Sequence, residues 1–233
     1  MNMKQLDWKL PEGVFAAVTS VAEPGNLAVH VNDEPATVIR HRRQLQRELN
    51  LPASPRWLRQ VHSTHIVDFD AAYPTVEADA VYANRGQTVC AVLTADCLPI
   101  LLCSQDGQEI AAVHAGWRGL AGGIIQNALA RFQAKPRELL AYIGPAISMP
   151  AFEVGDEVRE AFLSTEAVDS DTFRSHIQGK WHANLPLLAQ RILEQQGCLS
   201  VQQSAHCTYT DSRWYSYRRD SSCGRIASLI WKK

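Results

Sequence analysis

Two apolar runs that each stop at or just before a metal-binding side chain place the strongest constraint on how this chain can fold. One run, residues 89–93, stops just before Thr94-Ala95-Asp96-Cys97-Leu98-Pro99, and the other, residues 110–113, stops at His114. A turn-forming segment, Gln105-Asp106-Gly107-Gln108, lies between them. Short apolar runs bounded by turn residues are typical of buried strands. Because strands that end beside each other bring their last residues together, we expect Cys97 and His114 to meet in space.

The remaining periodicity predicts many strands and few helices. Helical spacing predicts helices at 35–49, 119–132 and 184–196, the last ended by Gly197, and a shorter helix at 155–163. The elements interleave without regular strand–helix–strand alternation, which argues against a Rossmann sheet. We therefore expect an α/β (α+β) layered fold with mixed or mostly antiparallel sheets, as one domain over residues 1–233. The strands are predicted near 13–18, 28–31, 57–61, 79–83, 88–94, 98–103, 109–114, 139–143, 206–209, 214–218 and 225–231.

Charge and hydropathy narrow the range of partners. The formal net charge is −1, which provides no electrostatic footprint for nucleic acid or for an anionic membrane. No apolar stretch is long enough for a membrane span, and the N-terminus lacks the apolar core of a signal peptide. We therefore expect a cytoplasmic protein whose six cysteines are reduced thiols.

A third side chain that can bind a metal is His62, in the segment Arg59-Gln60-Val61-His62-Ser63. This segment follows the short apolar-aromatic run Trp57-Leu58. One thiolate and two imidazoles, from Cys97, His62 and His114, suit a tetrahedral zinc site with its fourth position open, and an open position indicates an enzyme. The spacing fits no zinc finger, and the HExxH and zinc deaminase patterns are absent. Each residue alone is also explained as a buried core side chain. We expect His65 to be an exposed loop residue.

Two further segments are candidates for substrate contacts. The glycine-rich stretch Gly116-Trp117-Arg118-Gly119 opens a predicted helix, where backbone N–H groups and Arg118 could hold an anion. The same glycines could instead only permit close helix–strand packing. Downstream, Tyr215, Tyr217 and Arg218 bring aromatic and basic side chains together, as a planar base would require, although an ordinary polar strand explains them equally.

Several longer motifs, in the same order, resemble the YfiH-type family, which was long labelled "laccase domain" or "multicopper polyphenol oxidase". The similarity runs from about residue 13 to the C-terminus. The motifs are Gln60-Val61-His62, Ala78-Asp79-Ala80, Thr94-Ala95-Asp96-Cys97-Leu98-Pro99, Val113-His114-Ala115-Gly116-Trp117-Arg118-Gly119, Ile143-Gly144-Pro145-Ala146-Ile147, Phe152-Glu153-Val154, and Tyr215-Ser216-Tyr217-Arg218-Arg219-Asp220 with Gly224-Arg225.

The resemblance implies a four-layer α/β/β/α sandwich and zinc at His62, Cys97 and His114. It implies zinc-dependent phosphorolysis of adenosine, inosine and 5′-methylthioadenosine, together with adenosine deamination. Copper and polyphenol oxidation belong to the older label. The eight histidines lack the His-x-His pairs of a multicopper cluster, and one cysteine with two histidines cannot hold four coppers.

We expect specific roles for individual residues. Cys97, His114, Asp96 and Arg118 are the catalytic candidates, with Asp96 as a proton carrier and Arg118 as a phosphate contact. Ser20 stands where the family usually has an arginine, whereas His30 and Asp33 still match it. The substrate-binding candidates are Gln60, Trp117, Gly119, Tyr215, Tyr217 and Arg218.

Two other classes of function stay open. A cysteine hydrolase would use Cys97 as its nucleophile and His114 as its base. The third hypothesis is a non-catalytic role, as a cell-wall editing factor. The preferred nucleoside and the oligomeric state do not follow from the sequence.

Overall fold

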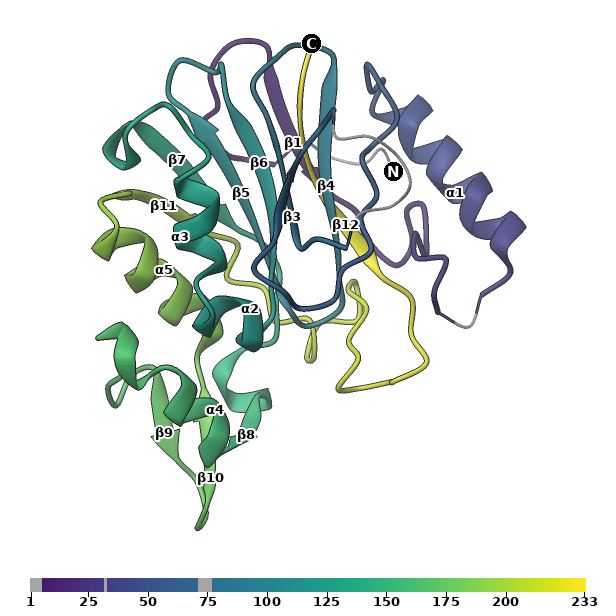
Figure 1. Cartoon of the computed structure of the whole chain (residues 1–233). Helices are drawn as coiled ribbons and strands as arrows, with labels where there is room; N and C mark the ends of the chain where they lie inside the picture. The colour runs from purple at the N-terminus through teal and green to yellow at the C-terminus, as the bar shows by residue number, and fades with distance from the viewer. Residues whose placement is uncertain (1–5, 32, 71–76) are drawn as a thin grey trace.

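Two β-sheets stacked face to face form the centre of the computed structural model, which describes residues 6–31, 33–70 and 77–233 (Figure 1). The larger sheet is mixed, because β11 pairs with β7 and β2 with β3 in parallel while the other pairs are antiparallel. Its order is β11 (Ser200–Gln203), β7 (Leu139–Ile143), β5 (Leu98–Ser104), β6 (Ile110–Ala115), β3 (Ala80–Ala83) and β2 (Ile66–Asp68). The smaller, antiparallel sheet has the order β1 (Val14–Val18), β12 (Ile226–Lys232) and β4 (Thr88–Thr94).

Strand β5 shows why these runs are apolar without alternation. Leu98, Ile100 and Leu102 pack on the helix side of the large sheet, and Leu101 and Cys103 pack between the two sheets. Successive side chains of a strand point to opposite faces. A strand covered on both faces therefore needs apolar residues at every position.

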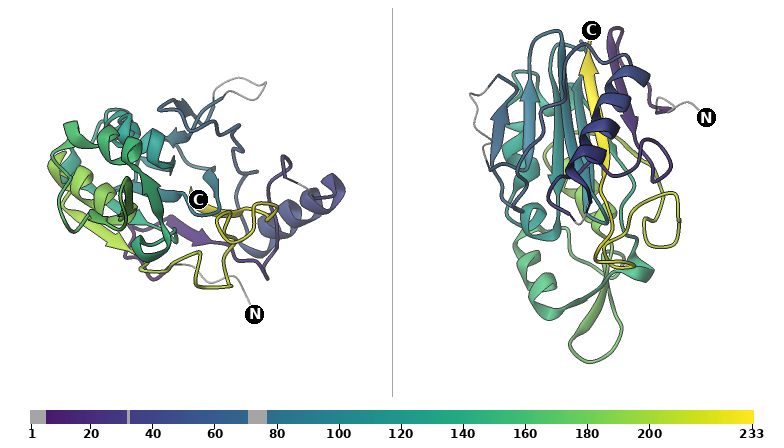
Figure 2. Two further views of the ribbon diagram at one scale, coloured as in Figure 1. Left: turned by 90° about the horizontal axis from the view of Figure 1, so that it is seen from below. Right: turned by 90° about the vertical axis from the view of Figure 1, so that its right-hand side faces the viewer.

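Helices cover the outer face of each sheet. On one side α1 (Pro35–Glu48) packs Leu45 against Leu229 and Trp231 of the small sheet. On the other side lie α2 (Trp117–Ala121), α3 (Ile124–Leu129) and α5 (Leu185–Gln195). The two groups of helices stand at opposite ends of the view from below (Figure 2). The layers therefore run α/β/β/α, which confirms the expected sandwich.

A small antiparallel sheet extends from one end of this body, at the bottom of Figure 1. Its order is β8 (Glu153–Gly155), β10 (Lys180–Ala183) and β9 (Phe173–Ser175), and α4 (Asp156–Ala161) packs against it.

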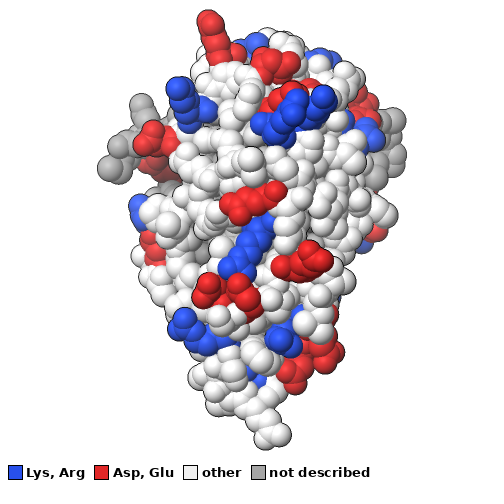
Figure 3. Space-filling model, turned by 90° about the vertical axis from the view of Figure 1, so that its left-hand side faces the viewer, with Lys and Arg blue, Asp and Glu red and all other residues white. Residues whose placement is uncertain are grey.

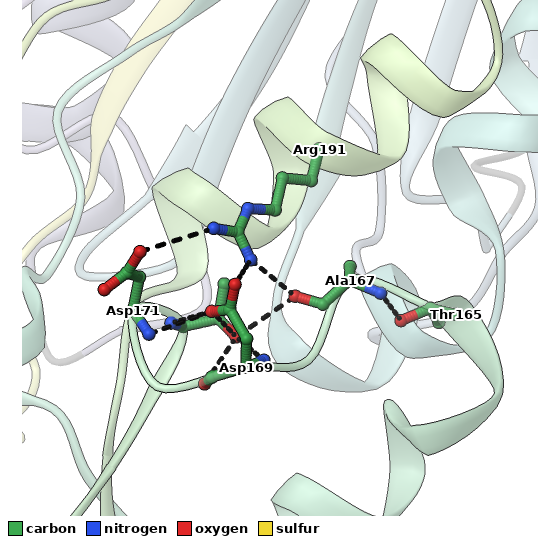
Figure 4. Close-up of polar contacts among 6 residues, drawn as sticks. Thr165, Ala167, Asp169, Asp171 and Arg191 are labelled. Atoms are coloured by element: carbon green, nitrogen blue, oxygen red, sulfur yellow. Dashed lines mark hydrogen bonds and ion pairs between the residues drawn. The ribbon is translucent and has the colours of Figure 1, made fainter.

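Arg191 of α5 ties the segment leading into β9 to the main body. Its guanidinium group donates to Asp169 and to the carbonyl of Ala167, and lies 3.7 Å from Asp171 (Figure 4). This link holds the small sheet against the helix layer.

Seven of the predicted strands are confirmed within one or two residues, but four predicted strands are wrong. Residues 28–31, 57–61, 206–209 and 214–218 form loops and turns. Side chains bond the backbone there instead of a neighbouring strand. Asn26 donates to the carbonyl of Ala28 and accepts from its N–H, and Arg219 donates to the carbonyls of Thr208 and Trp214.

The predicted helices need smaller corrections. The helix expected at 119–132 begins at Trp117 and breaks at Gly122 and Gly123, where Gly123 has a φ of 94° that ends helical geometry. The helix expected at 155–163 covers only Asp156–Ala161. The helices predicted at 35–49 and 184–196 are confirmed, with Asn184 capping α5 by accepting from the N–H of Leu187.

The charge distribution on the surface and the state of the cysteines match what the sequence predicts. On the side shown in Figure 3, Lys and Arg residues are interspersed with Asp and Glu, so this face presents no field of one sign. All six cysteines are free thiols. None of the helices in the described part of the chain combines the length and apolarity that crossing a bilayer requires.

We expect Leu101→Ala to lower the free energy of unfolding by about 2–5 kcal/mol, because the lost side chain would leave a cavity between the two sheets. Leu101 is fully buried, whereas Leu199 is 74% exposed. Leu199→Ala is the control and should change the unfolding free energy by less than about 0.5 kcal/mol. Urea unfolding followed by circular dichroism measures both, and equal effects would contradict this packing.

Candidate metal centre

Strand β6 places His114 between the neighbouring strands β5 and β3. On one side it pairs with β5, where Pro99 lies opposite His114. Cys97 lies in the turn between β4 and β5, directly before β5, and its thiol contacts the His114 side chain. On the other side Asp79 directly precedes β3, and its carbonyl accepts from the N–H of His114 at 2.7 Å. The strand register thus brings together residues from three separate parts of the chain.

His62 reaches the same place from a loop. It adopts a positive φ of 60°, a conformation that is uncommon outside glycine. The carboxylate of Asp79 stabilises this turn by accepting from the N–H groups of His62 at 3.0 Å and of Ser63 at 2.6 Å. The Ser63 hydroxyl donates to the same carboxylate at 2.7 Å.

The donor atoms of His62, Cys97 and His114 converge. One from each lies within 4.8 Å of the others, and Cys97 Sγ is 3.8 Å from His62 Nε2. A sulfur and a nitrogen bound to one tetrahedral zinc ion lie about 3.6 Å apart, given bond lengths of about 2.3 and 2.1 Å. The residues therefore fit a single divalent transition metal with little movement. His114 is buried but His62 is exposed, so the group opens to solvent.

Gly116 leaves the room that this convergence needs. A Cβ atom at this position would lie 2.7 Å from His62 Cδ2 and 3.2 Å from Cys97 Sγ. Any larger residue would push two of the donors apart. The glycine that follows β6 is therefore part of the centre.

Hydrogen bonding sets the protonation of the group. Burial opposes charge on the Cys97 thiol, but its contacts with His114 and His62 outweigh burial and lower its pKa to about 6. Burial also raises the pKa of Asp79, yet the bonds from His114 and Ser63 bring it down to about 2. The lowered pKa favours the thiolate form of Cys97, which is the form that binds metals. Asp79 Oδ1 accepts from His114 Nδ1 at 2.7 Å, which leaves Nε2 on the Cys97 side. Burial opposes charge on His114, but its contacts with Asp79 and Cys97 raise its pKa to about 9, so a metal ion would displace the proton on Nε2.

Asp96 has a different environment from the one expected for a proton carrier. One carboxylate oxygen accepts from the Thr208 hydroxyl at 2.6 Å and the other from the N–H of Arg218 at 2.7 Å. Its φ of 88° is also in the left-handed region. Both oxygens are therefore engaged in holding the 206–220 loop beside Cys97.

Three of the other candidate residues make contacts within the protein that give them a structural role. The amide of Gln60 donates to the carbonyl of Leu93 and accepts from its N–H, both at 2.8 Å, so it anchors the His62 loop to β4. Gly119 is buried, and a Cβ atom there would lie 3.1 Å from the carbonyl oxygen of Ser63, which supports close packing. Arg218 donates to the carbonyls of Ala151 at 3.3 Å and Glu153 at 3.2 Å.

The remaining candidates lie nearer to solvent. Trp117 packs partly against the helix-side core, and the guanidinium of Arg118 lies 4.3 Å from the centre of its ring. Tyr217 is 55% exposed, and Tyr215 packs close to Gly224. No described contact joins these four side chains to the three donors.

Sequence reasoning missed Asp79 and Thr208 as members of the site. Asp79 lies in the apolar segment Ala78-Asp79-Ala80-Val81, and a charged residue at such a position is a signal that a buried partner exists. Thr208 carries no comparable signal, because its partner Asp96 is 112 residues away.

A cavity of about 830 Å³ lies apart from the three donors. Ser20, Tyr142, His206 and Trp214 are among its lining residues, whereas His62, Cys97 and His114 are not. The position where the family usually has an arginine therefore faces this cavity.

Comparisons with known proteins identify the family of this chain. The sequence pattern of the family described as multi-copper polyphenol oxidoreductase laccase matches residues 15–233. Purine nucleoside phosphorylase YfiH from Shigella flexneri is 44% identical over 96% of both chains, and the protein of the same name from Escherichia coli K12 is 42% identical over 96% of both. The crystal structure of Neisseria meningitidis protein NMB0706 is 42% identical, covers 100% of both chains and superposes with a TM-score of 0.93. The chain therefore belongs to the multi-copper polyphenol oxidoreductase laccase family, together with relatives of the YfiH type.

Proposed function

We propose that this chain is a zinc-dependent purine nucleoside phosphorylase that also deaminates adenosine. The observation that carries the proposal is the convergent donor group His62, Cys97 and His114, which is open to solvent on one side. Curated relatives named purine nucleoside phosphorylase, 38–44% identical over nearly the whole chain, support the phosphorolysis reaction. The proposed substrates are adenosine, inosine and 5′-methylthioadenosine, with inorganic phosphate.

We propose zinc as the metal, despite the copper in the family's description. One thiolate and two imidazoles form a ligand set that leaves one tetrahedral position open. When bound, zinc supplies a Lewis acid without redox chemistry, and neither phosphorolysis nor deamination requires electron transfer. The two donor groups within the described residues hold three side chains each, fewer than a four-copper cluster requires.

The protein's own residues orient the reaction centre in this scheme. Asp79 holds His114 so that Nδ1 is protonated and Nε2 faces the metal position. In phosphorolysis a phosphate oxygen bonds to C1′ of the sugar while the bond from C1′ to the purine nitrogen breaks, and the purine leaves with a proton. We assign Arg118 to phosphate, since its guanidinium group is a charged donor at the start of α2. Trp117, Tyr215 and Tyr217 are the aromatic candidates for the purine. We place the enzyme in the cytoplasm.

We expect His114→Ala to abolish metal binding and phosphorolysis together. Removing a ligand should cost more than removing a ligand's partner, so activity should fall by more than about 100-fold. His65→Ala is the matched control, because His65 is exposed and outside the donor group. Metal analysis of purified protein and chromatographic detection of adenine with ribose 1-phosphate measure both effects.

Alkylation of Cys97 and an assay with a chelator present separate the cysteine hydrolase, which the lowered pKa of Cys97 and its link through His114 to Asp79 also favour. A nucleophilic Cys97 would be alkylated rapidly and would keep its activity with a chelator present. Turnover by metal-free protein would contradict the zinc mechanism.

We expect Asp79→Asn to weaken zinc affinity by about 10–100-fold, because an amide cannot accept from His114 and from the 62–63 turn with both of its atoms. Asp70→Asn, at an exposed carboxylate, is the control and should leave affinity unchanged. Competition with a chromophoric chelator measures affinity, and thermal unfolding confirms that both variants are folded. Wild-type affinity in a folded Asp79→Asn protein would contradict the role of Asp79.

Asp96 acts as a positioning residue in this proposal, and Thr208→Val tests that role against proton transfer. If Asp96 holds the 206–220 loop, Thr208→Val and Asp96→Asn should both raise KM several-fold without moving the pH profile of kcat. The first removes one donor to the carboxylate, and the second leaves one acceptor oxygen for two donors. If Asp96 carries a proton, only Asp96→Asn should lower kcat and alter that profile. Steady-state kinetics across pH distinguish the two outcomes.

A further inference from the structure

The small β8–β10–β9 sheet carries a second group of metal-binding side chains. In β10, His182 pairs with Glu153 of β8 on one side and with Arg174 of β9 on the other. Residues directly opposite in an antiparallel pair project from the same face. His176 lies two residues beyond Arg174 and shares that face. The register therefore brings Glu153, His176 and His182 together from three positions along the chain.

The opposite face of this sheet is the one that packs. Phe173 is 3% exposed and its ring lies 5.9 Å from that of Phe162. Trp181 donates its indole N–H to Asp156 of α4 at 2.7 Å. Burial of an apolar surface thus accounts for the residues on that face but not for the two imidazoles on the other. His176 and Glu153 are 44% and 40% exposed, so an ion from solvent can reach them.

Distances within the group match those around a metal ion. His176 Nε2 lies 3.4 Å from Glu153 Oε2, and a nitrogen and an oxygen bound to one tetrahedral zinc ion lie about 3.4 Å apart. The same separation is longer than an ordinary N–H···O hydrogen bond of about 2.7–3.2 Å. One donor atom from each of the three residues lies within 4.8 Å of the others. The imidazoles of His176 and His182 stack with ring centres 4.5 Å apart, so one ring would turn about its side-chain bonds for both nitrogens to point at the same ion.

We propose that Glu153, His176 and His182 bind a second divalent transition-metal ion of the zinc class. Two imidazoles and one carboxylate are a recurrent ligand set for zinc, with one position left for water. Arg174 and Lys180 project from the same face, so their positive charges oppose a cation. We therefore expect weaker binding than at the thiolate-containing group. The site is independent of the proposed catalytic function.

A metal here would act on the strand that Arg218 holds. The guanidinium of Arg218 donates to the carbonyl of Glu153, and its N–H donates to Asp96, the residue before Cys97. Binding would join the 176–180 turn to β8 and stiffen the small sheet beside the 206–220 loop. The second ion is thus an accessory one that fixes structure next to the first group.

Zinc titration of the full chain, followed by calorimetry and metal analysis, tests the proposal. The wild-type chain should bind two equivalents, His182→Ala one, and His114→Ala one of the weaker class. The double variant His114→Ala/His182→Ala should bind none. His206→Ala, an exposed histidine outside both groups, is the control and should keep two equivalents.

Cobalt substitution identifies which group is filled. A cobalt–thiolate absorption band reports the Cys97 group, so His182→Ala should lose one equivalent of cobalt and keep this band in full. This readout also applies if His114→Ala fails to fold. A single equivalent of cobalt in the wild-type chain with the thiolate band at full strength, or two equivalents in His182→Ala, would overturn the second site while leaving the first untouched. Loss of the band from the wild-type chain with one equivalent retained would instead overturn the thiolate site.

Discussion

The buried carboxylate of Asp79 is the interaction on which the rest of the site depends. A charge in the protein interior is costly unless hydrogen bonds and ion pairs compensate for it. Asp79 is fully buried, and it receives the imidazole N–H of His114, the hydroxyl of Ser63 and backbone N–H groups of the 61–63 turn. One side chain therefore orients His114 on β6 and stabilises the strained turn that carries His62.

The two stacked sheets provide the rigid frame for this arrangement. Strands β4, β5 and β6 are buried along their whole length, so their register cannot slip without exposing apolar residues. The turn after β4 and the end of β6 consequently hold Cys97 and His114 in fixed relation. The 206–220 loop lacks such a frame and depends on Asp96, through bonds that span 112 and 122 residues.

Much of the fold and the convergence of His62, Cys97 and His114 could be predicted from the sequence. The donors were found because Cys97 and His114 interrupt apolar runs, and the long strands were found because burial on both faces leaves continuous apolar segments. The segments 57–61 and 214–218 have the apolar and aromatic residues of a strand, but they form loops. Hydrogen bonds between side chains and the backbone hold these loops in place of strand pairing. Gln60 bonds Leu93 and Arg219 bonds Trp214, and such contacts leave no period in the sequence. The short strands β8, β9 and β10 were missed since three or four residues are too few to show alternation.

The sequence by itself determined the chemical types at the centre and the layered class of the fold, because donor identity and apolar periodicity are local properties of the chain. Tertiary structure alone decided how those groups are supported. It matched Asp79 to His114, committed both oxygens of Asp96 to the 206–220 loop, and gathered Glu153 with two histidines on one face of the small sheet. Each of these pairings joins residues far apart in the chain. Their formation depends on strand register and on the need to satisfy buried polar groups, which only the folded chain brings into play.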